Sequence, residues 1–127
     1  MEPSPEQVES LKRRAAAGEP EAQYHLGLYV FREDKAESFR WLCKAAMQRW
    51  YDAQIAVGTF YEFGVKPIEL DYVEAMMWYL LAYPARLEPS RKLAKEMTPS
   101  QIARAEQMSR EWKPGACPDP NHPLPAK

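Results

Sequence analysis

The sequence has few cysteines and no surplus of either charge. Its two cysteines, Cys43 and Cys117, lie far apart in a chain without a hydrophobic leader, so we expect no disulfide and a reducing compartment, the cytoplasm. The 17 basic and 18 acidic residues give a net charge of -1. Proteins that bind nucleic acid through phosphate contacts normally carry a basic excess. We therefore expect no nucleic-acid partner.

Long apolar runs are also absent. The longest, Ala75 to Tyr83, is about half of the ~20 residues that a helix needs to cross a bilayer. The start of the chain, Met1 to Glu6, is acidic and contains prolines, unlike the basic and apolar start of a signal peptide. We therefore expect neither a membrane span nor a secretory leader. The hydrophobic share of 46% is too high for a disordered chain, and the length suits one domain with its own core.

Helix signals recur along the chain. Capping boxes, in which Ser, Thr or Asp is followed three residues later by Glu or Gln, mark helix starts, and Gly18 and Gly64 can adopt the left-handed conformation that ends a helix. No segment alternates between apolar and polar residues as a strand would, so the chain is predicted to be all-α. Capping boxes begin at Ser4, Asp34, Asp71 and Thr98. The predicted helices are about 5–17, 20–31, 34–47, 51–63, 71–83, 89–97 and 99–112.

The chain contains an internal repeat. Residues 22–29 align with residues 53–60, because both segments read Ala, Gln, two free positions, an aliphatic, Gly, one free position and an aromatic. Residues 37–42 likewise align with 74–79, with a tryptophan in the same column. The repeated unit is a helix pair. We place the two units at about 20–48 and 51–83, within a helical domain over 1–112 that precedes a proline-rich, extended tail over 113–127.

Each unit carries a glycine inside its first helix. A glycine there costs about 1 kcal/mol relative to alanine, so Gly27 and Gly58 call for a steric reason. We predict that each glycine, with the alanine that begins the aligned segment, clears space for the neighbouring helix, and that Trp41 and Trp78 fill the gap beside these small residues.

These residues resemble Sel1-like repeats, relatives of the tetratricopeptide class. Residues 97–112 are similar to the closing helix often found after such repeats in bacterial proteins, and Arg49 occupies a column where the family usually has glycine. The resemblance implies a short α-α superhelix, or solenoid, of antiparallel helix pairs, closed by the terminal helices at about 5–17 and 99–112, in a bacterial protein that binds other proteins. The repeat positions are Ala22, Leu26, Gly27, Trp41, Ala53, Gly58, Tyr61, Gly64, Ala75 and Trp78.

No catalytic constellation is visible in the sequence. His25 lies in mid-helix and is predicted to be a surface or groove histidine, and Cys43 is predicted to be a small buried apolar residue. His122 and Cys117 lie together in the proline-rich tail, whereas a metal site needs three or four rigidly held ligands. We therefore expect no enzyme and no cofactor. A metal-dependent or thiol enzyme that uses Cys117 and His122 is kept as the alternative.

A binding face follows from helical phase. If the repeat alanines face inward, the opposite side of each first helix presents a row that mixes apolar, aromatic and basic side chains. Such a surface is costly on a monomer and indicates a groove for another protein or peptide. The predicted function is a non-catalytic interaction module, such as an adaptor, inhibitor or immunity-type binder; a structural homo-oligomer that covers this row is the other alternative. The predicted row is Tyr24, Leu28, Arg32, Ile55, Thr59 and Phe63.

Overall fold

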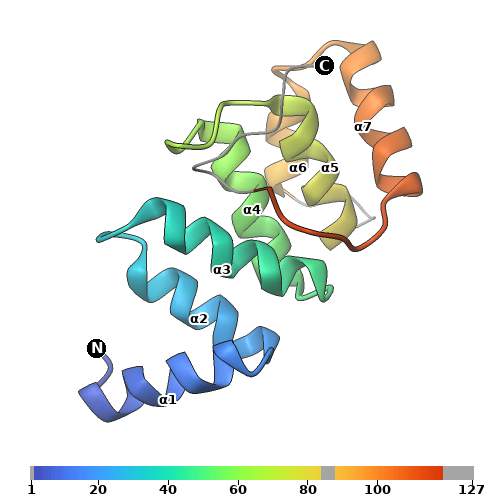
Figure 1. Cartoon of the computed structure of the whole chain (residues 1–127). Coiled ribbons are helices and arrows are strands. Elements are labelled where there is room, and N and C mark those ends of the chain that lie inside the picture. Colours follow the sequence, from blue (N-terminus) through green and yellow to red (C-terminus); the bar gives the residue numbers. More distant parts are fainter. Residues whose placement is uncertain (1, 84–87, 119–127) are drawn as a thin grey trace.

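The computed structural model describes residues 2–83 and 88–118, and within them every regular element is a helix. Helices stack one after another from α1 (blue) at one end to α7 (orange) at the other (Figure 1). The fold is therefore an all-α helical repeat solenoid, as the sequence predicts. The helices are α1 (Pro5–Ala16), α2 (Pro20–Val30), α3 (Lys35–Met47), α4 (Tyr51–Phe63), α5 (Tyr72–Ala82), α6 (Glu88–Ala94) and α7 (Pro99–Glu111).

Two helix pairs form the centre of the stack. Helix α2 packs on α3 and α4 packs on α5, and the pairs meet where α3 contacts α4. Helix α1 packs on α2, and α7 packs on α5. Each pair begins its second helix in the same way, because the side chains of Asp34 and Asp71 accept hydrogen bonds of 3.0 Å from the backbone N–H of Glu37 and Glu74. A side-chain cap of this kind stabilises a helix by about 1 kcal/mol.

The repeat glycines lie where the two helices of a pair approach closely. A Cβ atom on Gly27 would stand 2.8 Å from Cγ of Leu42, and one on Gly58 would stand 2.6 Å from Cε1 of Tyr79. Both would also lie 3.2 Å from a backbone carbonyl oxygen of the facing helix. No real Cβ fits at such distances without displacing its neighbours. The glycines therefore allow α2 to approach α3 and α4 to approach α5.

The side-chain atoms nearest to each repeat glycine belong to the residue after the repeat tryptophan, Leu42 at Gly27 and Tyr79 at Gly58. Trp41 packs against the buried cluster that contains Ala22, and Trp78 belongs to the cluster that contains Ala53. The helical period separates the two roles, since one residue turns the side-chain direction by about 100°. Each tryptophan therefore packs in the cluster of the repeat alanine, while its successor lies over the repeat glycine.

Helix α1 packs on α2 as α3 packs on α4. The buried amide Nε2 of Gln23 donates to the carbonyl oxygen of Ala15 at 3.2 Å, and Nε2 of Gln54 donates to the carbonyl oxygen of Ala46 at 3.2 Å. Helix α1 thus occupies the place of the second helix of a preceding pair. Its outward residues are charged, as in a helix that caps a repeat array. The exposed charged residues of α1 are Glu6, Glu9, Lys12 and Arg13.

The repeat position at which Arg49 stands in place of glycine has a left-handed backbone conformation. Gly18 has a φ of 98° and Arg49 has a φ of 65° in the equivalent turn. A left-handed conformation costs a non-glycine residue roughly 1–2 kcal/mol. The guanidinium carbon of Arg49 lies 5.2 Å from the centre of the Trp112 ring, and such a cation–π contact offsets about 0.5–1 kcal/mol of that cost.

Exchanging Arg49 separates these two effects. Arg49→Ala loses the contact with Trp112 and keeps the strain, whereas Arg49→Gly loses the contact and relieves the strain. We expect the glycine variant to be more stable than the alanine variant by about 1 kcal/mol in urea unfolding. Equal stability of the two variants would show that the backbone at residue 49 carries no strain.

Candidate functional site

The six predicted binding residues do not form one exposed row. Leu28 and Phe63 are 48% and 68% exposed, and Arg32 is exposed just beyond the end of α2. Tyr24, Ile55 and Thr59 are half-buried. Of the six predicted residues, only Leu28, Arg32 and Phe63 therefore present an exposed side chain.

The half-buried residues hold helices together. Ile55 packs against the buried cluster that contains Ala75. The Thr59 hydroxyl donates to the carbonyl oxygen of Ile55 at 3.0 Å and lies 3.3 Å from the Tyr79 hydroxyl. The Tyr79 hydroxyl itself donates to Glu62 at 2.6 Å. Burial, together with this bond to Glu62, raises the pKa of Tyr79 above its ordinary value, so the hydroxyl keeps its proton.

Tyr24 is similarly engaged with the protein interior. It packs against the largest buried cluster, and its ring meets that of His25 edge-on with centroids 5.2 Å apart. Burial, followed by the nearby charge of Asp52, raises the pKa of its hydroxyl. A side chain engaged on two sides contributes less free surface to a partner than the sequence predicts.

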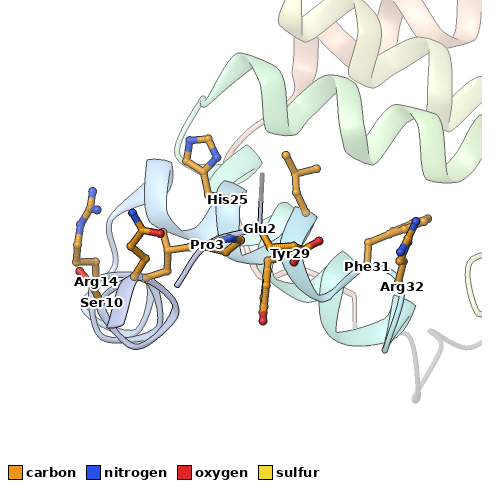
Figure 2. A pocket seen from close by; sticks show the side chains of 11 residues that line it. Glu2, Pro3, Ser10, Arg14, His25, Tyr29, Phe31 and Arg32 are labelled. Carbon is orange, nitrogen blue, oxygen red and sulfur yellow. The ribbon is translucent and has the colours of Figure 1, made fainter. Parts of the chain in front are cut away.

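A groove of about 910 Å³ lies between α1 and α2, and we call it the α2 groove. In the view of Figure 2, Ser10 and Arg14 lie on the α1 side and Phe31 and Arg32 on the other, with Pro3 between them. Its walls mix apolar, aromatic and basic groups, a composition suited to a peptide or protein loop. The lining is Glu2, Pro3, Gln7, Ser10, Leu11, Arg14, His25, Leu28, Tyr29, Phe31 and Arg32.

The sequence predicts some of the residues that line this groove, but not all of them. Leu28 and Arg32 are in the predicted row and line the groove. Tyr29, which is 42% exposed, and Leu11 were missed. The prediction used only the phase of the first helix of each pair, α2 and α4, whereas the groove also needs α1. The sequence did contain a signal for the contribution of α1, because this helix carries charged residues on one side and Leu11 on the other.

The basic groups of the α2 groove differ in how they are paired. Arg14 approaches Glu19 at 3.2 Å and Glu21 at 3.6 Å. Arg32 forms no ion pair with any residue in the ranges 2–83 and 88–118. Arg32 therefore keeps its donors available for a carboxylate of a partner.

Cys43 and Cys117 form a disulfide, so the expectation of no disulfide is wrong. Their Cα atoms are 6.0 Å apart although the residues are separated by 74 positions. After α7 the chain runs back across the stack towards α3 (Figure 1, red). We call the described part of this tail, residues 113–118, the strap. The expectation of a reducing compartment rested on unpaired cysteines, and the disulfide removes that basis.

The enzyme alternative loses its proposed thiol. Cys117 is bonded to Cys43 in this structure, and neither sulfur offers a thiolate to a metal or a substrate. No group of three or more potential metal ligands occurs in the part of the chain that the structure describes. His122 and the rest of the predicted tail over 119–127 lie outside the described residues.

The helix pairs with their repeated small-residue contacts define an α-helical repeat protein. The Sel1 repeat model matches residues 20–49 and 52–83. These bounds lie within one residue of the units predicted at 20–48 and 51–83. The chain is a Sel1-like repeat protein. Proteins of this kind are generally protein-interaction modules and typically non-enzymatic scaffolds.

One solved structure illustrates the likeness. The chain is 30% identical to c5321, a protective antigen present in uropathogenic Escherichia coli strains that displays an SLR fold, with a TM-score of 0.75. The match covers 83% of this chain and 24% of that chain, so this chain spans about a quarter of its structural relative. No match is found among curated proteins. No helix among the described residues has the length and apolar character of a membrane span.

Proposed function

We propose that this protein is a non-catalytic module that binds a segment of another protein through the α2 groove, as an adaptor, inhibitor or immunity-type binder. The observation that carries the proposal is a groove of about 910 Å³ with two half-exposed apolar side chains, Leu28 and Tyr29, on one wall. Exposed aromatic and aliphatic side chains in a concavity are typical of binding sites. Arg32, which has no ion-pair partner among the described residues, adds a preference for a segment that carries a carboxylate.

Phe63 belongs to a second part of the proposed surface. It is exposed at the end of α4, as Tyr51 is at the start of the same helix. Tyr24, Ile55 and Thr59 are proposed to contribute only the parts of their side chains that remain exposed. A partner long enough to follow the first helices of both pairs would contact α2 and α4 in turn.

Introducing negative charge into the groove tests this proposal. We expect a Leu28→Asp, Tyr29→Asp variant to recover at least about tenfold less partner than the wild type in affinity capture, a loss of about 1.4 kcal/mol. Leu70→Asp is the matched control, because Leu70 is 55% exposed and does not line the groove. Circular dichroism of each variant checks that the helices remain.

Three outcomes distinguish the possibilities. Loss of the partner with the groove variant alone supports the α2 groove. Equal recovery of the partner by the wild type and by every variant contradicts it. Loss of the partner with Phe63→Asp alone would place the site on α4 instead. A structural homo-oligomer is the second candidate, because exposed apolar side chains can also be covered by another copy; light scattering would then give a fixed mass above 14.7 kDa with no other protein retained.

A further inference from the structure

The two sulfurs of the disulfide differ in accessibility. Cys43 lies in α3 inside the largest buried cluster and has 0% exposure. Cys117 is half-buried in the strap and lines a groove of about 520 Å³ that Cys43 does not line. The walls of this groove include Arg40 and Lys44. A small thiolate entering the groove therefore meets Cys117 and a cationic surface, which favours the attacking anion.

Within the described parts of the chain, few contacts other than the disulfide hold the strap. Residues 113–116 are all exposed, and a Cβ on Gly115 would have no neighbour within 4 Å. The backbone N–H of Gly115 donates to Sδ of Met47 at 3.4 Å, a weak bond to a thioether. By contrast, the root of the strap is firmly packed, because the rings of Trp112 and Trp78 meet edge-on at 5.8 Å. The disulfide is thus the main tie between residues 113–118 and α3.

We propose that Cys117 is a site of thiol–disulfide exchange with a dithiol, and that exchange releases the strap from α3 while the helices stay folded. One thiolate of the dithiol attacks Sγ of Cys117, the Cys43–Cys117 bond breaks, and Cys43 leaves as a thiolate that takes up a proton. The second thiol of the dithiol then attacks its partner sulfur in the mixed disulfide and releases Cys117, which is protonated in turn. The dithiol is oxidised by two electrons and the protein disulfide is reduced.

Release has a defined structural consequence. The strap links the end of α7, beyond the second helix pair, to α3 in the first pair. Opening the disulfide removes this link between the two repeats and uncovers the side of α3 that carries Met47. The α2 groove between α1 and α2 and the groove beside Cys117 share no lining residue. The exchange site is therefore separate from the proposed partner site, and the two can be tested independently.

Trapping of the mixed disulfide tests which sulfur is attacked. The oxidised full-length protein is incubated with reduced glutathione, quenched with iodoacetamide and digested, and the Cys43 and Cys117 peptides are analysed by mass spectrometry. The proposal predicts glutathione on Cys117 and the alkyl group on Cys43. Glutathione on Cys43, or an even division between the two, would overturn it.

Hydrogen exchange tests the release. After reduction by dithiothreitol we expect the amides of residues 115–117 to lose their protection and to exchange at least about tenfold faster. The amides of α2–α5 stay protected, although the lower global stability speeds up the slowest of them. The Cys43→Ser, Cys117→Ser double variant serves as the control. It should show fast amide exchange in the strap in both the presence and the absence of dithiothreitol. Reduction only at the rate of global unfolding, or loss of protection in the helices together with the strap, would contradict the proposal.

Discussion

Replacing Cys43 and Cys117 together by alanine is expected to lower the free energy of unfolding by about 4 kcal/mol. The disulfide closes a loop that contains α4, α5, α6 and α7, and the chain-entropy relation for a loop of this length gives about 4 kcal/mol. Cys43 is fully buried, so its truncation adds the small cost of lost packing. Urea unfolding of the oxidised wild type and of the double variant gives the difference directly.

The matched control is the wild type in excess dithiothreitol, which should unfold at nearly the same urea concentration as the double variant. A difference of less than about 1 kcal/mol between the oxidised and the variant protein would show that the cross-link does not constrain the unfolded chain. A domain is typically stable by about 5–15 kcal/mol. The loss of the disulfide therefore leaves the helices folded, as the proposed release of the strap requires.

A valine at Gly58 is expected to lower the free energy of unfolding by about 3 kcal/mol, near the upper end of overpacking effects. Even the first added carbon would stand 2.6 Å from the ring of Tyr79. That ring cannot easily move aside, because the Tyr79 hydroxyl donates to Glu62 at 2.6 Å and lies 3.3 Å from the Thr59 hydroxyl. The new side chain must therefore displace α5 or break this bond.

Gly115→Val is the control for this prediction. Gly115 has no atom within 4 Å of an added Cβ, so the substitution is expected to change the stability by less than about 0.5 kcal/mol. Both variants are compared with the wild type in thermal and urea unfolding. A Gly58 variant as stable as the Gly115 variant would mean that α4 and α5 do not meet as closely as described.

Local signals in the sequence were enough to predict the helices. Ser4 and Thr98 form complete capping boxes, and Gly64 ends α4 in the left-handed conformation. These features depend on residues a few positions apart, and a sequence displays such relations directly. The short α6 ends at Ala94, earlier than the predicted residue 97, because helix ends depend on packing as well as on caps.

Relations between distant residues were not predictable in the same way. The pairing of Cys43 with Cys117 depends on where the chain runs after α7, which no local pattern specifies. The α2 groove depends on the packing of α1, and the half-burial of Ile55 depends on a cluster built around α5. Helical phase tells which side of one helix faces outward, but the neighbouring helices decide how much of that side remains exposed.

The fold depends on glycines that let the helices of each pair approach closely, and a double-mutant cycle at Gly58 and Tyr79 tests this most directly. Gly58→Ala is measured by urea unfolding in the wild type and in a Tyr79→Ala background. We expect the substitution to destabilise the wild type by about 1–2 kcal/mol through overpacking. In the Tyr79→Ala background the ring is gone, and the better helix propensity of alanine should make the same substitution neutral or stabilising by up to about 1 kcal/mol. An equal effect of Gly58→Ala in both backgrounds, or stabilisation of the wild type, would contradict the close approach of α4 and α5.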